Sequence, residues 1–247
     1  MISVRRSINY SKSLIVLGLA TISLFLAPTS AKAFTLVNKT GFTDTDFNQL
    51  VDKGEFKELF VSEGRIGDRG GSATYELSIN NDVKLGGLPV EQRQFNWVNG
   101  QAVDFSLQYT GSVVNYIVGG QTLSSTAFSG PVSEIFLRTF AMNDSTATLS
   151  NLVFDGVGIE NLSSSATGSN QDVDYFQISN ISTPFLLTGK TTLSWTGATP
   201  PKNSQLAYQI KVGNTPSQSV PEPGTVGAIL LVTIAGVVRR KLAAGKA

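Results

Sequence analysis

The sequence predicts an all-β fold, an antiparallel β-sandwich or jelly roll with one short helix near its start. Runs of β-branched and aromatic residues alternate with polar residues at period two, and Gly, Asn, Ser and Pro separate these runs. Many short strands divided by turn residues are typical of sandwiches and jelly rolls. The predicted strands lie at residues 73–79, 103–109, 114–118, 133–141, 147–154, 173–179, 190–196 and 206–212.

One pair of these runs predicts a hairpin. Residues 103–109 and 114–118 are joined by a short polar segment that contains Gly111, and glycine readily adopts the backbone angles of a tight turn. Residues 160–172 are rich in Ser and Asn, and we expect them to form a polar loop.

A short helix is predicted at the start of the domain. Residues 43–46 (Thr-Asp-Thr-Asp) can cap it, and Gly54 would end it. Its apolar face would consist of Phe47, Leu50 and Val51. We expect this helix to cover an open end or edge of the sandwich.

The composition excludes several classes of site. The 247 residues include no Cys and no His, which rules out disulfides, cysteine or imidazole metal sites and a Ser-His-Asp triad. Residues 34–219 hold 11 of the 19 basic residues and 17 of the 18 acidic residues, so their formal net charge is −6. An acidic body argues against nucleic-acid binding and permits calcium binding.

The first 33 residues have the pattern of a secretory signal peptide. A basic start precedes an apolar run over residues 14–27, and Ala31 and Ala33 are the small residues that signal peptidase reads. Cleavage is therefore expected before Phe34. The alternative is an uncleaved N-terminal anchor, although the run is short for a membrane span.

The C-terminus has three parts in a fixed order. The motif Val220-Pro221-Glu222-Pro223 comes first, and an uncharged apolar segment follows at residues 224–238. The cluster Arg239-Arg240-Lys241 comes next, six residues before the end. An apolar helix here could cross the membrane, and the basic cluster favours a cytoplasmic position for the tip. The signal peptide and the C-terminal segment thus predict the same topology, with the body on the outer side of the membrane and the tip in the cytoplasm.

This tripartite ending resembles the PEP-CTERM sorting signal. The resemblance implies an exported protein of a Gram-negative-type bacterium, one that often makes extracellular polysaccharide. It also implies recognition by the membrane enzyme exosortase, which processes the tail near the tripeptide. The alternative is a plain C-terminal anchor that stays uncut. The chain then divides into a signal peptide (1–33), a sandwich domain (34–213), a linker (214–219) and a sorting signal (220–247).

The body also resembles the exported domains called choice-of-anchor domains. The segments that carry this resemblance are residues 58–68 (ELFVSEGRIGD) and 97–105 (WVNGQAVDF). It implies an extracellular β-sandwich without an established activity.

One candidate metal site lies at the predicted helix. Asp44, Asp46, Asn48 and Glu55 have the spacing of oxygen ligands in an EF-hand calcium loop. However, Gln49 stands where such loops need Gly for a sharp turn. The alternative is that the same acidic residues stabilise a helix N-terminus. No cofactor is required by any other motif.

A candidate glycan-stacking surface consists of Trp97 and Trp195, with Tyr109 and Tyr116 as further aromatic residues. Aromatic faces can stack on pyranose rings, but a sandwich core also needs large aromatic side chains.

We therefore expect a non-enzymatic protein of the cell surface or extracellular matrix, membrane-anchored until its tail is processed. Its sandwich would be structural or would bind a partner such as extracellular polysaccharide. The alternative is a carbohydrate-active enzyme that uses Asp or Glu carboxylates, because such enzymes need two carboxylates beside a cleft.

Overall fold

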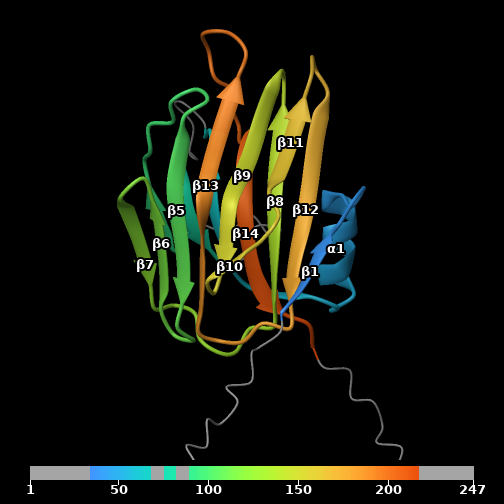
Figure 1. Cartoon of the computed structure of the whole chain (residues 1–247), viewed down its shortest axis with the longest axis vertical. Helices are drawn as coiled ribbons and strands as arrows, with labels where there is room; N and C mark the ends of the chain where they lie inside the picture. Colours follow the sequence, from blue (N-terminus) through green and yellow to red (C-terminus); the bar gives the residue numbers. More distant parts are fainter. Residues whose placement is uncertain (1–33, 68–74, 82–88, 217–247) are drawn as a thin grey trace, which may run out of the picture. The chain divides into compact units, whose positions relative to one another are not determined.

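The computed structural model describes residues 34–67, 75–81 and 89–216, which form a two-layer antiparallel β-sandwich (Figure 1). The predicted fold class is confirmed. Sheet A has the strand order β1-β12-β8-β14-β2-β3-β4. Sheet B has the order β10-β9-β13-β5-β6-β7, and β11 also pairs with β9.

Sheet A consists of β1 (Thr35–Asn38), β2 (Lys57–Arg65), β3 (Leu77–Asn80), β4 (Glu91–Arg93), β8 (Glu134–Met142), β12 (Gln171–Ser179) and β14 (Leu206–Asn214). Sheet B consists of β5 (Ala102–Tyr109), β6 (Val114–Val118), β7 (Gln121–Ser125), β9 (Ser145–Phe154), β10 (Val157–Gly158), β11 (Leu162–Ala166) and β13 (Phe185–Trp195). The described residues include one helix, α1 (Asp44–Asp52).

The predicted hairpin is formed by β5 and β6, which pair antiparallel from Phe105↔Val118 to Tyr109↔Val114. Gly111 in the connecting turn has a φ of 101°, a left-handed conformation that favours glycine. Alternate residues of both strands point into the core, while their neighbours face outward, as period-two patterning requires.

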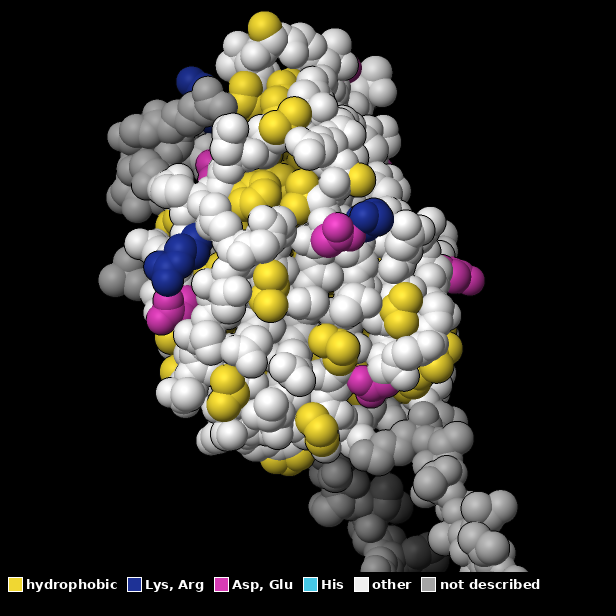
Figure 2. Space-filling view, turned by 60° about the vertical axis from the view of Figure 1, so that its left-hand side comes forward, with side chains coloured by type: hydrophobic (Ala, Val, Ile, Leu, Met, Phe, Trp, Pro, Cys, Tyr) yellow, Lys and Arg dark blue, Asp and Glu magenta, His cyan; other side chains and the backbone are white. Residues whose placement is uncertain are grey.

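The outer surface near this hairpin is poor in charge. Figure 2 brings the left-hand side of Figure 1 forward, where β5, β6 and β7 lie, and shows few charged side chains and scattered hydrophobic ones on this face. An exposed ion pair joins β5 to its other neighbour, β13, with Lys190 Nζ 2.6 Å from Asp104 Oδ1.

Residues 160–172 do not form the predicted loop throughout, because β11 runs through them and pairs with the first half of β9. Leu162, Ser164 and Ala166 are buried, and the alternate serines face outward. Ser163 and Ser165 lie within hydrogen-bond distance of Thr148 and Thr146 on β9. The Ser-rich composition concealed a period-two strand.

The helix forms as predicted, but it does not cover an end or edge of the sandwich. Thr43 is its N-cap, and α1 packs on the outer face of sheet A. Its Phe47 contacts Phe136 of β8 and Tyr175 of β12, with ring centroids 5.4 and 5.7 Å apart. These two aromatic side chains point away from the main core, so the helix is needed over them.

Strand β14 lies in the middle of sheet A and is buried on both faces. Its alternating apolar residues Leu206, Tyr208, Ile210 and Val212 belong to the main core. The residues between them are also buried, including Gln209 and Lys211, which are 8 % and 5 % exposed. Inside the core, the hydroxyls of Tyr208 and Tyr116 lie 2.5 Å apart and link the two sheets.

Both ends of the described chain lie at the same end of the sandwich, which we call the terminal end. Thr35 pairs with Ser179, Ser179 with Glu134, and Glu134 with Gly213 near the end of β14. The turns at residues 143–144, 167–170 and 196–205 lie at the opposite end, which we call the distal end (Figure 1).

The close approach of β2 to Tyr208 yields a first prediction. Gly64 faces the Tyr208 ring, and a Cβ at this position would clash with the ring carbons. We expect Gly64→Ala to lower the free energy of unfolding by about 2 kcal/mol, the usual cost of overpacking a core. Urea unfolding of the full chain measures this difference.

Gly158→Ala is the matched control, because a Cβ at Gly158 would meet no atom within 4 Å. Its unfolding midpoint should stay close to that of the unchanged chain. Equal stability of the two variants would contradict the proposed packing.

Candidate functional site

The expected processing sites lie almost wholly outside the described residues. These are Ala31 and Ala33, the motif Val220-Pro221-Glu222-Pro223 and the cluster Arg239-Arg240-Lys241. Phe34, the expected first residue of the mature chain, is half-buried, and the centroid of its ring lies 5.0 Å from the centroid of the Phe154 ring. In the part of the chain that the structure describes, no helix has the length and hydropathy that a membrane span requires.

The acidic residues of the candidate calcium site are engaged in the helix cap and an ion pair. Asp46 accepts hydrogen bonds from the backbone N–H and hydroxyl of Thr43, which lower its pKa, and Thr43 caps the helix in return. Asp44 accepts two hydrogen bonds from Arg138, at 2.6 and 2.5 Å. Asn48 is half-buried and Glu55 is exposed beyond the end of the helix.

The described residues contain no group of three or more acidic side chains that could hold a metal ion. The helix-capping interpretation of these acidic residues therefore fits the geometry, since Asp44 and Asp46 lie in the first turn of α1.

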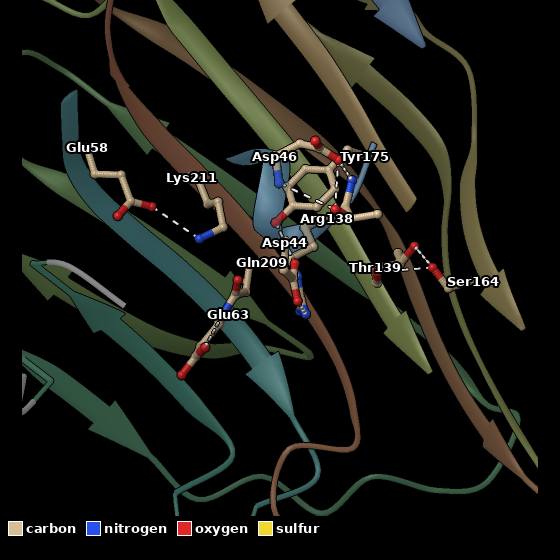
Figure 3. A network of polar contacts seen from close by, with 11 residues as sticks. Asp44, Asp46, Glu58, Glu63, Arg138, Thr139, Ser164, Tyr175, Gln209 and Lys211 are labelled. Carbon is tan, nitrogen blue, oxygen red and sulfur yellow. Dashed lines mark hydrogen bonds and ion pairs between the residues drawn. The ribbon is translucent and has the colours of Figure 1, made fainter. Parts of the chain in front are cut away.

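Asp44 belongs to a row of polar side chains on the outer face of sheet A, which we call the outer-face row (Figure 3). Its members are joined by hydrogen bonds or ion pairs and come from α1, β2, β8, β12 and β14. They are Asp44, Glu58, Glu63, Arg138, Tyr175, Gln209 and Lys211.

The centre of the outer-face row is the pair of Asp44 and Arg138. Tyr175 donates a third hydrogen bond to Asp44, at 2.7 Å. Burial alone would raise the pKa of Asp44, but the hydrogen bonds and charge of Arg138, with the Tyr175 hydroxyl and the charge of Lys211, hold it below its ordinary value. Burial alone would lower the pKa of Arg138, but the hydrogen bonds and charges of Asp44 and Tyr175 raise it above its ordinary value.

A second ion pair of the row is almost fully buried. Lys211 Nζ lies 3.2 Å from Glu58 Oε1, and the two side chains are 6 % and 3 % exposed. Burial lowers the pKa of Lys211, and the carboxylate of Glu58 partly offsets this effect. The ammonium group also lies 4.3 Å from the centre of the Phe47 ring, which adds a cation–π contact.

The third part of the row is centred on Glu63. Its two carboxylate oxygens accept hydrogen bonds from Ser78 and Gln209, both at 2.9 Å. Because the charges of the row have partners, we regard it as a structural network, and none of the three cavities described below includes its side chains.

The aromatic candidates separate into core residues and one surface residue. Trp97 is 8 % exposed, and its indole N–H donates to the Arg65 carbonyl oxygen at 2.9 Å. Tyr109 and Tyr116 are fully buried. The structure therefore does not bring these three residues to a surface with Trp195, and their packing accounts for their presence.

Trp195 is half-buried at the distal end of β13 and lines a cavity of about 380 Å³, which we call the distal cavity. The polar residues that line the distal cavity come from the β8–β9 turn and the β13–β14 connection. They include Asn143, Thr196, Lys202, Asn203 and Gln205. Trp195 is a candidate from its residue type alone, whereas the amides were not predicted, although the turn-forming character of Asn was a usable signal.

Two further cavities lie at the terminal end. One is lined by residues near the cis Thr183-Pro184 bond and the β5–β6 turn. The other, of about 690 Å³, is lined by Lys53, Glu55, Glu134 and Thr215 among others, beside the start of the linker.

No family model matches this chain, and a search of curated proteins finds no significant match.

The outer-face row predicts a pH-dependent stability. Asp44→Asn should lower the free energy of unfolding by about 1–2 kcal/mol near pH 7, because it leaves the buried Arg138 without its charged partner. The loss is no larger because Asp44 is half-exposed, so water screens the ion pair. Since folding depresses the pKa of Asp44, its contribution is complete above the ordinary value of 3.8 and disappears as the pH falls through the lower folded-state value. Urea unfolding of both chains between pH 7 and pH 3 measures the difference.

Asp104→Asn provides the control, because it removes the same type of charge from the exposed pair with Lys190, whose side chains are 81 % and 38 % exposed. It should have a much smaller effect. A difference between Asp44→Asn and the unchanged chain that stays the same from pH 7 to pH 3 would contradict the ion-pair mechanism.

Proposed function

We propose that this chain is an exported surface or extracellular-matrix protein, sorted through its PEP-CTERM-like ending, whose β-sandwich is a binding or structural module rather than an enzyme. The observation that carries the proposal is the order of motif, apolar segment and basic cluster at residues 220–241, in a chain that begins with a signal-peptide pattern. Signal peptidase and exosortase would process it, and a C-terminal helix would hold it in the membrane until then.

The limits of the folded domain fit this proposal. Strand β1 begins at Thr35, one residue after the expected first residue of the mature chain. Strand β14 ends at Asn214, close to the start of the expected linker. The sandwich thus occupies the segment that export and sorting would leave intact.

The position of the two ends also supports a surface role. Phe34 and Asn214 both lie at the terminal end, where Asn214 donates to the Pro131 carbonyl oxygen and Asn180 donates to Thr35. While the C-terminal helix anchors the chain at this end, the distal end, with its turns and the distal cavity, is free to meet partners. Loops at one end of a rigid sandwich are a common place for binding residues.

The sorting motif gives a direct test. Replacement of Pro221, Glu222 and Pro223 by Ala should block tail removal and leave the chain in the membrane fraction. Intact mass spectrometry of membrane and extracellular fractions from the native cells measures this. The unchanged chain should begin at Phe34 and end near residues 221–223.

Replacement of Pro216, Ser217 and Gln218 by Ala is the control, because it changes the same number of residues just outside the motif. This variant should be processed and located like the unchanged chain. Normal processing of the motif variant, or a recovered mass that still includes residues 239–247 of the unchanged chain, would contradict the sorting proposal.

A further inference from the structure

We propose that the distal cavity binds a neutral hexopyranose unit of a polysaccharide, with Trp195 as the stacking surface and the amides of Asn143 and Gln205 as hydrogen-bonding groups. This inference rests on the proposed function, because it supplies the partner that an exported surface module would hold.

Trp195 has the environment of a fixed stacking residue. It is half-buried, packs against the main core and lines the cavity. Asn99 fixes its backbone with two hydrogen bonds, since its amide donates to the Trp195 carbonyl oxygen at 2.8 Å and accepts from the Trp195 N–H at 2.9 Å. A rigid aromatic face loses little conformational entropy when a sugar ring lies on it.

The amides of the cavity provide both donors and acceptors. Asn143 Nδ2 donates to Gln205 Oε1 at 2.8 Å, so the two side chains hold each other in place. This bond leaves the Gln205 amide N–H groups and the Asn143 carbonyl oxygen for a ligand. A sugar hydroxyl both donates and accepts, so it suits this mixed set better than an ion of either sign does.

The walls of the cavity are preformed by backbone hydrogen bonds. Thr196 N–H donates to the Asp144 carbonyl oxygen at 3.0 Å, which ties the β13–β14 connection to the β8–β9 turn. Ser204 N–H donates to the Ile66 carbonyl oxygen at 2.9 Å, and Arg65 donates to the Ser204 hydroxyl at 3.0 Å. A preformed site avoids the cost of ordering loops when a ligand binds.

Charge selects the class of sugar. Lys202 is the one charged side chain among the residues that line this cavity, and in the described chain it forms no ion pair. Its ammonium group can donate to a hydroxyl, but the formal charge of −6 on residues 34–219 repels long acidic polymers. The cavity therefore fits a neutral sugar better than a uronate.

Tryptophan fluorescence can test the proposal, because the chain has two tryptophans and Trp97 is buried in the core. In the full chain with Trp97→Phe, purified in mild detergent, Trp195 is the single reporter. We would titrate it with neutral hexasaccharides of glucose, galactose and mannose, and with a galacturonate hexamer as the acidic comparison.

We expect at least one neutral hexasaccharide to change the Trp195 emission and protect it from acrylamide quenching, with a dissociation constant of about 0.1–1 mM. The galacturonate hexamer should bind at least about tenfold more weakly. Isothermal titration of the unchanged chain repeats the measurement without any substitution.

Two variants locate the binding. Gln205→Ala should weaken binding by about tenfold, and Trp195→Leu should weaken it further. Gln205→Ala keeps the site testable if loss of Trp195 disturbs the fold. Gln108→Ala is the matched control, because Gln108 is exposed on β5, outside the residues that line the cavity, and it should bind like the unchanged chain.

Three results would overturn the inference. These are no binding of any neutral hexasaccharide up to about 10 mM, equal or tighter binding of the galacturonate hexamer, and unchanged binding in both cavity variants. Processing and location are measured separately by intact mass. A correctly processed chain that binds no sugar would thus remove this inference and leave the proposed sorting intact.

Discussion

The covering of the outer face of sheet A is the constraint on which the rest of the domain depends. Phe136 and Tyr175 point to this face, so α1 must lie over them to keep them from water. The helix also withdraws Arg138 and Lys211 from solvent, and buried charges without partners cost several kcal/mol. Asp44 and Glu58 supply the carboxylates that pair with these two cations, and the contact of Asp44 with Arg138 ties the start of α1 to β8.

A strand of this fold is predictable from the sequence where one of its faces is buried and the other is exposed to solvent. The hairpin of β5 and β6 was predicted because one face is buried and the other is exposed. Strand β11 was missed because its buried positions include Ser164, which resembles a loop residue in composition. The cap of α1 was readable from Thr43 and Asp46, but its location depends on Arg138, 94 residues from Asp44, which no local pattern reveals.

The candidate site shows the same division between local and distant information. Trp195 and Trp97 were both predicted as stacking residues because they are tryptophans, although Trp97 packs in the core. The distal cavity exists because the β8–β9 turn and the β13–β14 connection meet at one end of the sandwich. Asn143 and Gln205 are 62 residues apart, so their hydrogen bond could be known only from the paired register of β8 and β14.

The central place of β14 has a mechanical consequence. A pull on the C-terminal linker enters sheet A through a strand that is hydrogen-bonded along both sides, to β8 and to β2. Because antiparallel hydrogen bonds lie perpendicular to the strands, a force along β14 shears two whole rows of bonds at once and does not peel them apart one by one. The edge strand β1, which has a single partner, carries none of this load when its own end is free. A pull on the linker along β14 therefore meets the resistance of both rows of hydrogen bonds together.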